Sequence, residues 1–123
     1  MNTVYTEHYI HLDYMPQPTK EGTLYSLLAV DNVSQYCFPP VHTPAINIDA
    51  LCKQIDTLLN NADFKKLKGQ PTLVLGHSQF LLQQLNDRYQ QKPNIIFNEA
   101  TTHQVTKTIK DHLLAARLNR QTS

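Results

Sequence analysis

The sequence predicts an α/β domain in which helices cover both faces of a mixed, five-stranded sheet. Two observations favour this class. Three runs with strand character come first, and after residue 46 apolar residues recur at helical spacing between short apolar runs. Strands joined by short turns pair antiparallel, whereas strands joined through a helix pair parallel. We therefore expect an antiparallel unit of three strands followed by two parallel strands.

Size and composition are those of one globular domain. The chain has 123 residues, of which 41% are hydrophobic and 17% are charged. These proportions suffice for a core and exclude wholesale disorder. The formal net charge of +1 excludes a wholly basic nucleic-acid coat but leaves a local basic patch open. Residues 1–123 are expected to form a single domain.

Alternation and turn residues predict the first three strands. The expected strands are residues 9–14, 23–30 and 36–38. Pro16 and Pro18 are expected to end the first strand, and residues 20–22 read as a hairpin turn. Pro39 and Pro40 are expected to end the third strand early or to place it at an edge of the sheet.

Three helices and two short strands are expected after these runs. The strands are residues 72–75 and 94–97, and the first helix covers about residues 46–62. Ser78 is expected to cap a second helix that ends before Pro93, and Thr101 or Thr102 to cap the last helix. The residues of the last helix that are expected to face inward are Val105, Ile109, Leu113 and Ala116.

Four short segments occur in the same order as segments of one known family. They are His11–Tyr14, Tyr25–Ser34, Leu75–Phe80 and Asn98–Lys110. The first two are similar to a strand ending in a catalytic Asp and to a strand followed by an Asp and a Ser. The last two are similar to the family's D-x-G-S-Q-F/Y and D-N-A-x-x-E segments. Residues 7–118 thus resemble the catalytic core of retroviral integrases and DDE transposases, which implies a ribonuclease-H-like fold.

The resemblance places the family's three acidic catalytic positions on Asp13, Leu75 and His103, so only Asp13 is acidic here. The family uses two Mg²⁺ ions, which prefer oxygen ligands. Leucine has no donor atom, and an imidazole nitrogen suits transition metals better. Losing two ligands should lower activity by at least about 10²–10⁴-fold. We expect no tightly bound cofactor, with Mg or Mn on Asp13 if the site is active.

Two other metal sites stay open at this point. Glu99 lies four residues before His103 and could join Asp13 as a substitute carboxylate. His11 and Asp13 share a strand face, so that with His103 they could bind a transition metal. For Asp31 the favoured interpretation is a turn residue that bonds its own backbone.

The last helix predicts a contact with DNA. His103, Lys107, Lys110 and Arg117 lie within one arc at 100° per residue. The resemblance aligns Lys107 and Lys110 with basic residues that contact DNA in the family, and cations there would neutralise phosphates. An ordinary solvated helix face is the alternative explanation. The resemblance also implies a homodimer.

We therefore expect a domain associated with DNA integration or transposition that has lost efficient catalysis and acts in DNA binding or assembly. One alternative is an active metal-dependent polynucleotidyl transferase or nuclease with an altered site. Another is a protein-interaction module without a nucleic-acid role. Residues 1–7 have no secretory pattern, and Cys37 and Cys52 read as reduced core thiols, which predicts a cytoplasmic protein without a membrane partner.

Overall fold

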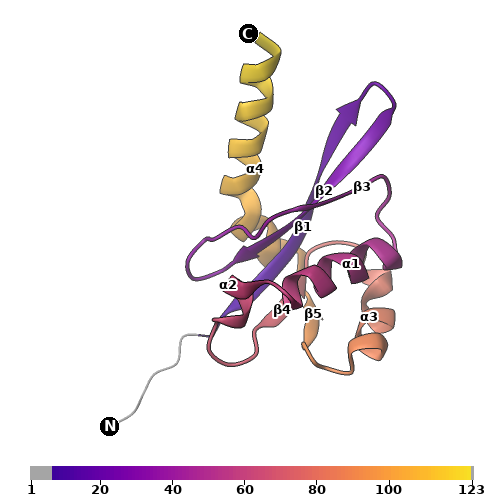
Figure 1. Cartoon of the computed structure of the whole chain (residues 1–123), viewed down its shortest axis with the longest axis vertical. Coiled ribbons are helices and arrows are strands. Elements are labelled where there is room, and N and C mark those ends of the chain that lie inside the picture. The colour runs from indigo at the N-terminus through magenta and orange to yellow at the C-terminus, as the bar shows by residue number, and fades with distance from the viewer. Residues whose placement is uncertain (1–6, 123) are drawn as a thin grey trace.

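A computed structural model describes the backbone of residues 7–122 and the side chains of residues 7–116. One mixed sheet has the strand order β3-β2-β1-β4-β5 (Figure 1). Its strands are β1 (Tyr9–Thr19), β2 (Gly22–Asp31), β3 (Val41–Thr43), β4 (Thr72–Leu75) and β5 (Ile95–Phe97). β1 and β3 pair antiparallel with β2, whereas β4 pairs parallel with both β1 and β5. The α/β class and the mixed five-stranded sheet are confirmed.

Helices lie on both faces of this sheet. They are α1 (Ile48–Leu59), α2 (Ala62–Lys65), the 3-10 turn η1 (Gln79–Leu81), α3 (Leu82–Tyr89) and α4 (Glu99–Thr122). Leu12 of β1 and Leu75 of β4 are register partners and belong to the core shared with α1 and α3. Because side chains alternate along a strand, His11 and Asp13 point to the other face, where α4 contacts them.

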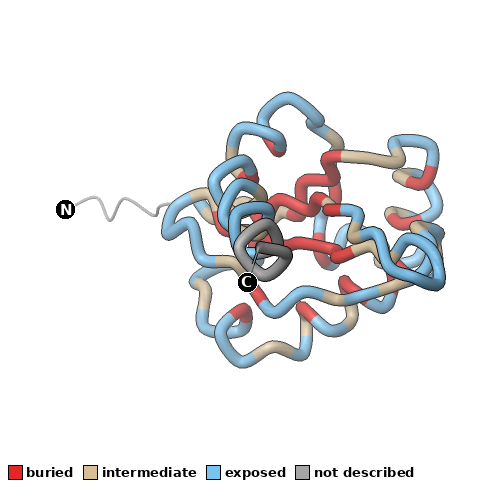
Figure 2. The backbone as a smooth tube through the Cα atoms, turned by 90° about the horizontal axis from the view of Figure 1, so that it is seen from above, coloured by how far each residue is buried: buried red, intermediate tan, exposed pale blue. Residues whose placement is uncertain are grey.

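The main core lies between the sheet and the pair α1 and α3. Its fully buried members include Leu12, Leu51, Ile55, Leu75 and Leu85. Figure 2 shows the buried positions concentrated along the central strands, with exposed positions in the outer loops. The apolar period of the sequence therefore identifies this layer correctly.

Strand β1 continues past the two prolines that were expected to end it. Pro16 and Pro18 lie opposite Tyr25 and Thr23 of β2 in the antiparallel register. β4 pairs with β1 only as far as Leu12, so beyond that residue the described part of the sheet gives β1 a partner strand on one side only. Proline is tolerated in such a strand because its missing N–H can lie on the unpaired side. The prediction of a strand end at Pro16 is wrong.

The third strand lies later than expected. Residues 36–38 contribute only an isolated bridge between Cys37 and Val30, and the strand itself forms at Val41–Thr43, after Pro39 and Pro40. A proline has no N–H to donate, so regular pairing begins only beyond this pair. The prediction of a strand at residues 36–38 is therefore wrong, and the strand that does form, β3, lies at the edge of the sheet.

The caps of the two later helices also differ from the expectation. Ser78 has a left-handed backbone with φ of 52° and makes no side-chain cap bond, and a 3-10 turn precedes α3. Helix α4 begins at Glu99, and the backbone N–H of Thr101 donates to Oδ1 of Asn98 at 3.0 Å. Asn98 therefore acts as the capping residue of α4, and Thr102 lies inside the helix.

Among the side chains described in helix α4, residues 99–116, the most deeply buried lie near the start of the helix. Thr102 and Thr106 are fully buried, and Val105, Ile109 and Leu113 are half-buried as expected for inward residues, whereas Ala116 is exposed. Figure 1 shows that the second half of the helix projects past the sheet, on the same side as the β1–β2 hairpin. The inward assignment of Ala116 is wrong for this reason. No helix within residues 7–122 has both the length and the apolar character needed to cross a membrane.

Candidate functional site

The candidate site lies where β1 and β4 end their parallel pairing. Asp13 follows Leu12, the last residue of β1 that pairs with β4, and Gly76 follows the end of β4. A Cβ atom on Gly76 would clash with the Thr102 methyl group and lie 2.7 Å from Thr102 Cβ. Glycine is therefore required here, because it lets α4 approach the sheet closely enough for its side chains to contact Asp13.

Asp13 is a buried carboxylate whose charge is matched inside the protein. Its side chain is 1% exposed, and Lys110 Nζ lies 2.7 Å from its Oδ2. The Thr106 hydroxyl donates to the same oxygen at 2.7 Å, and the Tyr14 N–H donates to Oδ1 at 2.8 Å. A buried carboxylate is stable when it is paired and hydrogen-bonded in this way. The ammonium group of Lys110 thus supplies the positive charge that offsets this carboxylate.

The imidazole of His103 lies between the carboxylates of Asp13 and Glu99. Its Nδ1 is 3.5 Å from Asp13 Oδ2, and its Nε2 is 3.6 Å from Glu99 Oε1. Both separations exceed hydrogen-bond length, and the side chains of His103 and Glu99 are 50% and 64% exposed. The structure thus brings together Asp13, His103 and Glu99 in a row, with the imidazole in the middle.

Leu75 lies on the opposite face of the sheet from Asp13. It is 0% exposed and packs in the core with Leu12, its register partner in β1. No donor atom of this residue reaches the candidate site. The triad-equivalent position on β4 therefore contributes an apolar core contact and no ligand.

The donor set does not fit a pair of magnesium ions. Asp13 is engaged by Lys110 and Thr106, and Glu99 reaches it only through His103. Among the side chains that the structure describes, no group of three or more His, Cys, Asp or Glu residues could hold a metal ion. Two magnesium ions need several carboxylate oxygens close together.

His11 does not join this cluster as a third ligand. Its Nδ1 lies 2.9 Å from the Thr102 hydroxyl, and its side chain is buried beneath α4. Burial lowers the pKa of His11, an effect that the charge of Asp31 opposes. His11 is thus a satisfied, buried imidazole, and the site with Asp13 and His103 that the sequence left open does not form.

A pocket of about 470 Å³ opens beside Asp13. Its lining includes Tyr14, Phe97 and the side chains of His77, His103 and Lys110. Burial lowers the pKa of His77 to about 4, so this imidazole is neutral near pH 7. Its Nδ1 lies 3.0 Å from the Ser78 hydroxyl, and its ring packs edge-on against Tyr14 with centroids 5.0 Å apart.

The residues expected to contact DNA have different environments. Lys107 is exposed on α4. Lys110 is 26% exposed, and its charge is used by Asp13. Arg117 lies on α4, but its side chain is outside the described residues. Of the expected basic face, Lys107 is the described residue whose charge points to solvent.

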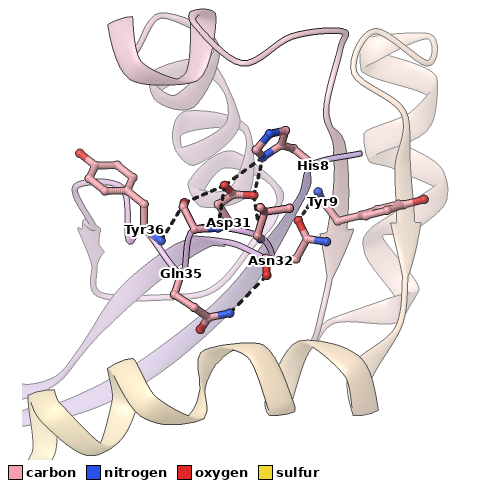
Figure 3. A network of polar contacts seen from close by, with 8 residues as sticks. His8, Tyr9, Asp31, Asn32, Gln35 and Tyr36 are labelled. Carbon is pink, nitrogen blue, oxygen red and sulfur yellow. Dashed lines mark hydrogen bonds and ion pairs between the residues drawn. The ribbon is translucent and has the colours of Figure 1, made fainter. Parts of the chain in front are cut away.

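Asp31 has the structural role that the sequence favoured. It is buried at the end of β2 and accepts from the Ser34 hydroxyl at 2.8 Å and from the Val33 and Ser34 N–H groups at 3.4 Å (Figure 3). His8 Nδ1 lies 2.9 Å from both carboxylate oxygens. Burial alone raises the pKa of Asp31, but these hydrogen bonds outweigh it and hold the pKa below its ordinary value. Asp31 thus stabilises the turn after β2, and it does not join Asp13 as a metal ligand.

Comparison with protein-family models gives no match for this chain, and comparison with curated proteins gives none either.

The sequence did not single out Thr106 or the pairing of Lys110 with Asp13. Helical spacing could have indicated that these side chains lie together, because positions 103, 106 and 110 fall on one side of a helix. His77 was not singled out either, and it lines the pocket from the turn that contains the left-handed Ser78.

Proposed function

We propose that the chain is an integrase-core-like domain with a ribonuclease-H-like arrangement that binds DNA without catalysing strand transfer or cleavage. The observation that supports this most is the contact of Lys110 with Asp13 at 2.7 Å. A lysine ammonium matches the charge of one carboxylate but cannot activate water or stabilise a leaving oxygen as a metal ion does. The activity implied by the resemblance is therefore absent in this proposal, while the scaffold remains.

The DNA-binding part of the proposal depends on the exposed side of α4. Lys107 lies on the helix that also carries His103 and Lys110. Lys107 is exposed, and beyond it α4 projects past the sheet (Figure 1). Contacts of this kind are made to phosphates, so the binding should be salt-dependent and tolerant of sequence.

The catalytic part is tested by incubating the full chain with supercoiled DNA in Mg²⁺ or Mn²⁺. We expect no nicking above the level of a sample without protein. Nicking that Asp13→Ala abolishes would overturn this part, because Asp13 would then be a functional ligand.

The binding part is tested by electrophoretic mobility and anisotropy at low salt, where phosphate contacts are strongest. Lys107→Glu should weaken binding several-fold and reduce the salt slope by about one. Lys53→Glu is the matched control, because Lys53 is an exposed lysine on α1, on the opposite face of the sheet. Equal losses in both variants would indicate a general charge effect, and absence of binding at low salt would favour a protein-interaction module.

An active enzyme with an altered site is the second candidate. The row of Asp13, His103 and Glu99, with separations of 3.5 and 3.6 Å, supports it. A metal ion there would have to displace Lys110 from Asp13. Nicking in Mn²⁺ or Zn²⁺ that depends on both Asp13 and Glu99 would favour this candidate over the first.

A further inference from the structure

We propose that a second pocket, at the amino end of β1 and β4, binds a phosphate monoester group. Its volume is about 490 Å³, within the range of small-molecule sites. Tyr9 and Thr72 form the first register pair of β1 with β4, whereas Asp13 lies beyond the last pair. The pocket is therefore separate from the candidate site, and the inference goes beyond the proposed function. Its lining includes Glu7, His8, Tyr9, Lys68 and Thr72.

The imidazole of His8 is oriented by the carboxylate of Asp31. Nδ1 lies 2.9 Å from both carboxylate oxygens, and Figure 3 shows this nitrogen directed at Asp31. Although burial raises the pKa of Asp31, the hydrogen bonds from His8 and Ser34 lower it below its ordinary value. An ionised carboxylate only accepts hydrogen bonds, so Nδ1 of His8 holds its hydrogen and Nε2 is the nitrogen left for a ligand.

Nε2 of His8 is accessible from the pocket. The His8 side chain is 19% exposed and lines the pocket, whereas Asp31 lies behind it and is 2% exposed. Nε2 has no hydrogen-bond partner among the described residues. It is not one of the fully buried atoms in this condition, which belong to Gln54, His77 and Asn86. Nε2 can accept from a ligand when the ring is neutral and donate when the ring is charged.

The same lining contains one cation and one carboxylate. Lys68 is exposed and forms no ion pair with any residue that the structure describes. Oε2 of Glu7 is held by the Tyr9 hydroxyl, which donates to it at 2.6 Å, and Oε1 receives no hydrogen bond from the described residues. A matching ligand therefore offers acceptors to the ammonium group and a donor to the carboxylate.

A phosphate monoester meets both requirements. Its second ionisation has a pKa of about 6, so near that pH the group carries negative charge together with a P–O–H donor. The ionised oxygens accept from Lys68, and the P–O–H group donates to Glu7. Sulfate lacks this donor at neutral pH, and so does the phosphodiester of a DNA backbone. Glu7 repels these two anions without compensation, so the pocket selects the monoester.

The test is an NMR titration of the full chain, followed through the ring signals of His8. The probes are inorganic phosphate, methyl phosphate, dimethyl phosphate and sulfate, at matched ionic strength and about pH 6. We expect phosphate and methyl phosphate to shift the signals in a saturable way. Their affinities should exceed those of sulfate and dimethyl phosphate by at least about tenfold, because one hydrogen bond to a charged group contributes about this factor.

Substitutions test the two halves of this recognition separately. Glu7→Gln replaces the carboxylate with an amide that can also donate, so the preference for phosphate over sulfate should fall below about twofold. Lys68→Met should weaken phosphate binding by at least about tenfold. Lys65→Met is the matched control, because Lys65 is an exposed lysine outside the lining, and it should keep both affinity and preference. All three side chains are exposed, so we expect the variants to fold.

Equal affinity for phosphate and sulfate in the natural chain would overturn the inference, because the P–O–H donor would then not be recognised. The absence of any saturable shift would also overturn it. Equal losses in Lys65→Met and Lys68→Met would do the same, since they would indicate a general effect of charge. None of these outcomes affects the proposed DNA binding, which depends on Lys107 of α4.

Discussion

Lys110 on α4 contacts Asp13 on β1 through a single pair of atoms, Nζ and Oδ2, which lie 2.7 Å apart. The carboxylate is 1% exposed, and the lysine is 26% exposed. The two elements are distant in sequence, so this pair fixes the first half of α4 against the sheet and also balances the buried charge. Its removal should therefore affect both stability and the chemistry of the site.

Lys110→Met should destabilise the protein by about 3 kcal/mol, because it leaves Asp13 as a buried charge without its cation. Denaturant unfolding of the single variant and of Asp13→Asn/Lys110→Met measures this effect. The double variant should regain at least about 1 kcal/mol, since it has no unpaired charge. Equal stability of the single and double variants would indicate that the ion pair contributes little.

Gly76→Ala should lower the free energy of unfolding by about 1–3 kcal/mol, which is typical of overpacking. The added Cβ would lie 2.7 Å from Thr102 Cβ and 3.1 Å from the Leu12 carbonyl oxygen. Thr102→Ser removes the methyl group and keeps the hydroxyl, so it should restore part of the loss in the double variant. Urea unfolding checks both, and an unchanged midpoint for Gly76→Ala would contradict the close approach of α4 to β4.

The contribution of Asp31 to stability should depend on pH. Although burial raises its pKa, the bonds from His8 and Ser34 lower it overall, so the folded state favours the ionised form. The stabilisation is therefore complete above the unfolded pKa of about 3.9 and is lost as pH falls through the folded value. Asp31→Asn should flatten the decline of the urea midpoint below about pH 4. The same slope in both proteins would show that Asp31 does not contribute to it.

Removal of divalent cations should leave DNA binding unchanged. Asp13 is neutralised by Lys110, so no metal ion is needed to reduce repulsion between this carboxylate and a phosphate. Anisotropy in EDTA and in Mn²⁺ at matched ionic strength measures the effect. Tighter binding in Mn²⁺ that disappears in Asp13→Asn would contradict the prediction and favour an altered metal site.

Sequence patterns predicted the architecture well where the spacing of apolar residues determines which element forms. The stripe of Leu51, Ile55 and Leu58 is buried in α1, and the short apolar run ending at Leu75 is the inner strand β4, between β1 and β5. The sequence patterns predicted the ends of the strands less well, because these ends depend on which neighbouring strands are present. Pro16 is compatible with a strand only because β1 has one partner there, and this depends on how far β4 extends.

For the site, the sequence placed Asp13 near His103 and Glu99, but it also placed Leu75 there and did not predict how the charges are used. Helical spacing placed His103 and Lys110 on one side of α4, and strand alternation placed Asp13 on the face that α4 covers. A lysine has a long flexible stem, so its spacing in the sequence does not determine whether the ammonium group contacts solvent or a buried carboxylate. His77 lines the pocket from the turn that contains the left-handed Ser78, a backbone conformation that the sequence patterns did not predict.

The orientation of Leu75 prevents a carboxylate at this position from meeting Asp13. Leu75→Asp would place a carboxylate among Leu12, Leu51 and Leu85, in the layer behind the sheet, where it would unfold the core before it could meet Asp13. A second carboxylate beside Asp13 would need a shift of the end of β4, and Lys110 would have to leave Asp13 at the same time. Neither change alone would create a pair of carboxylates that could share a metal ion.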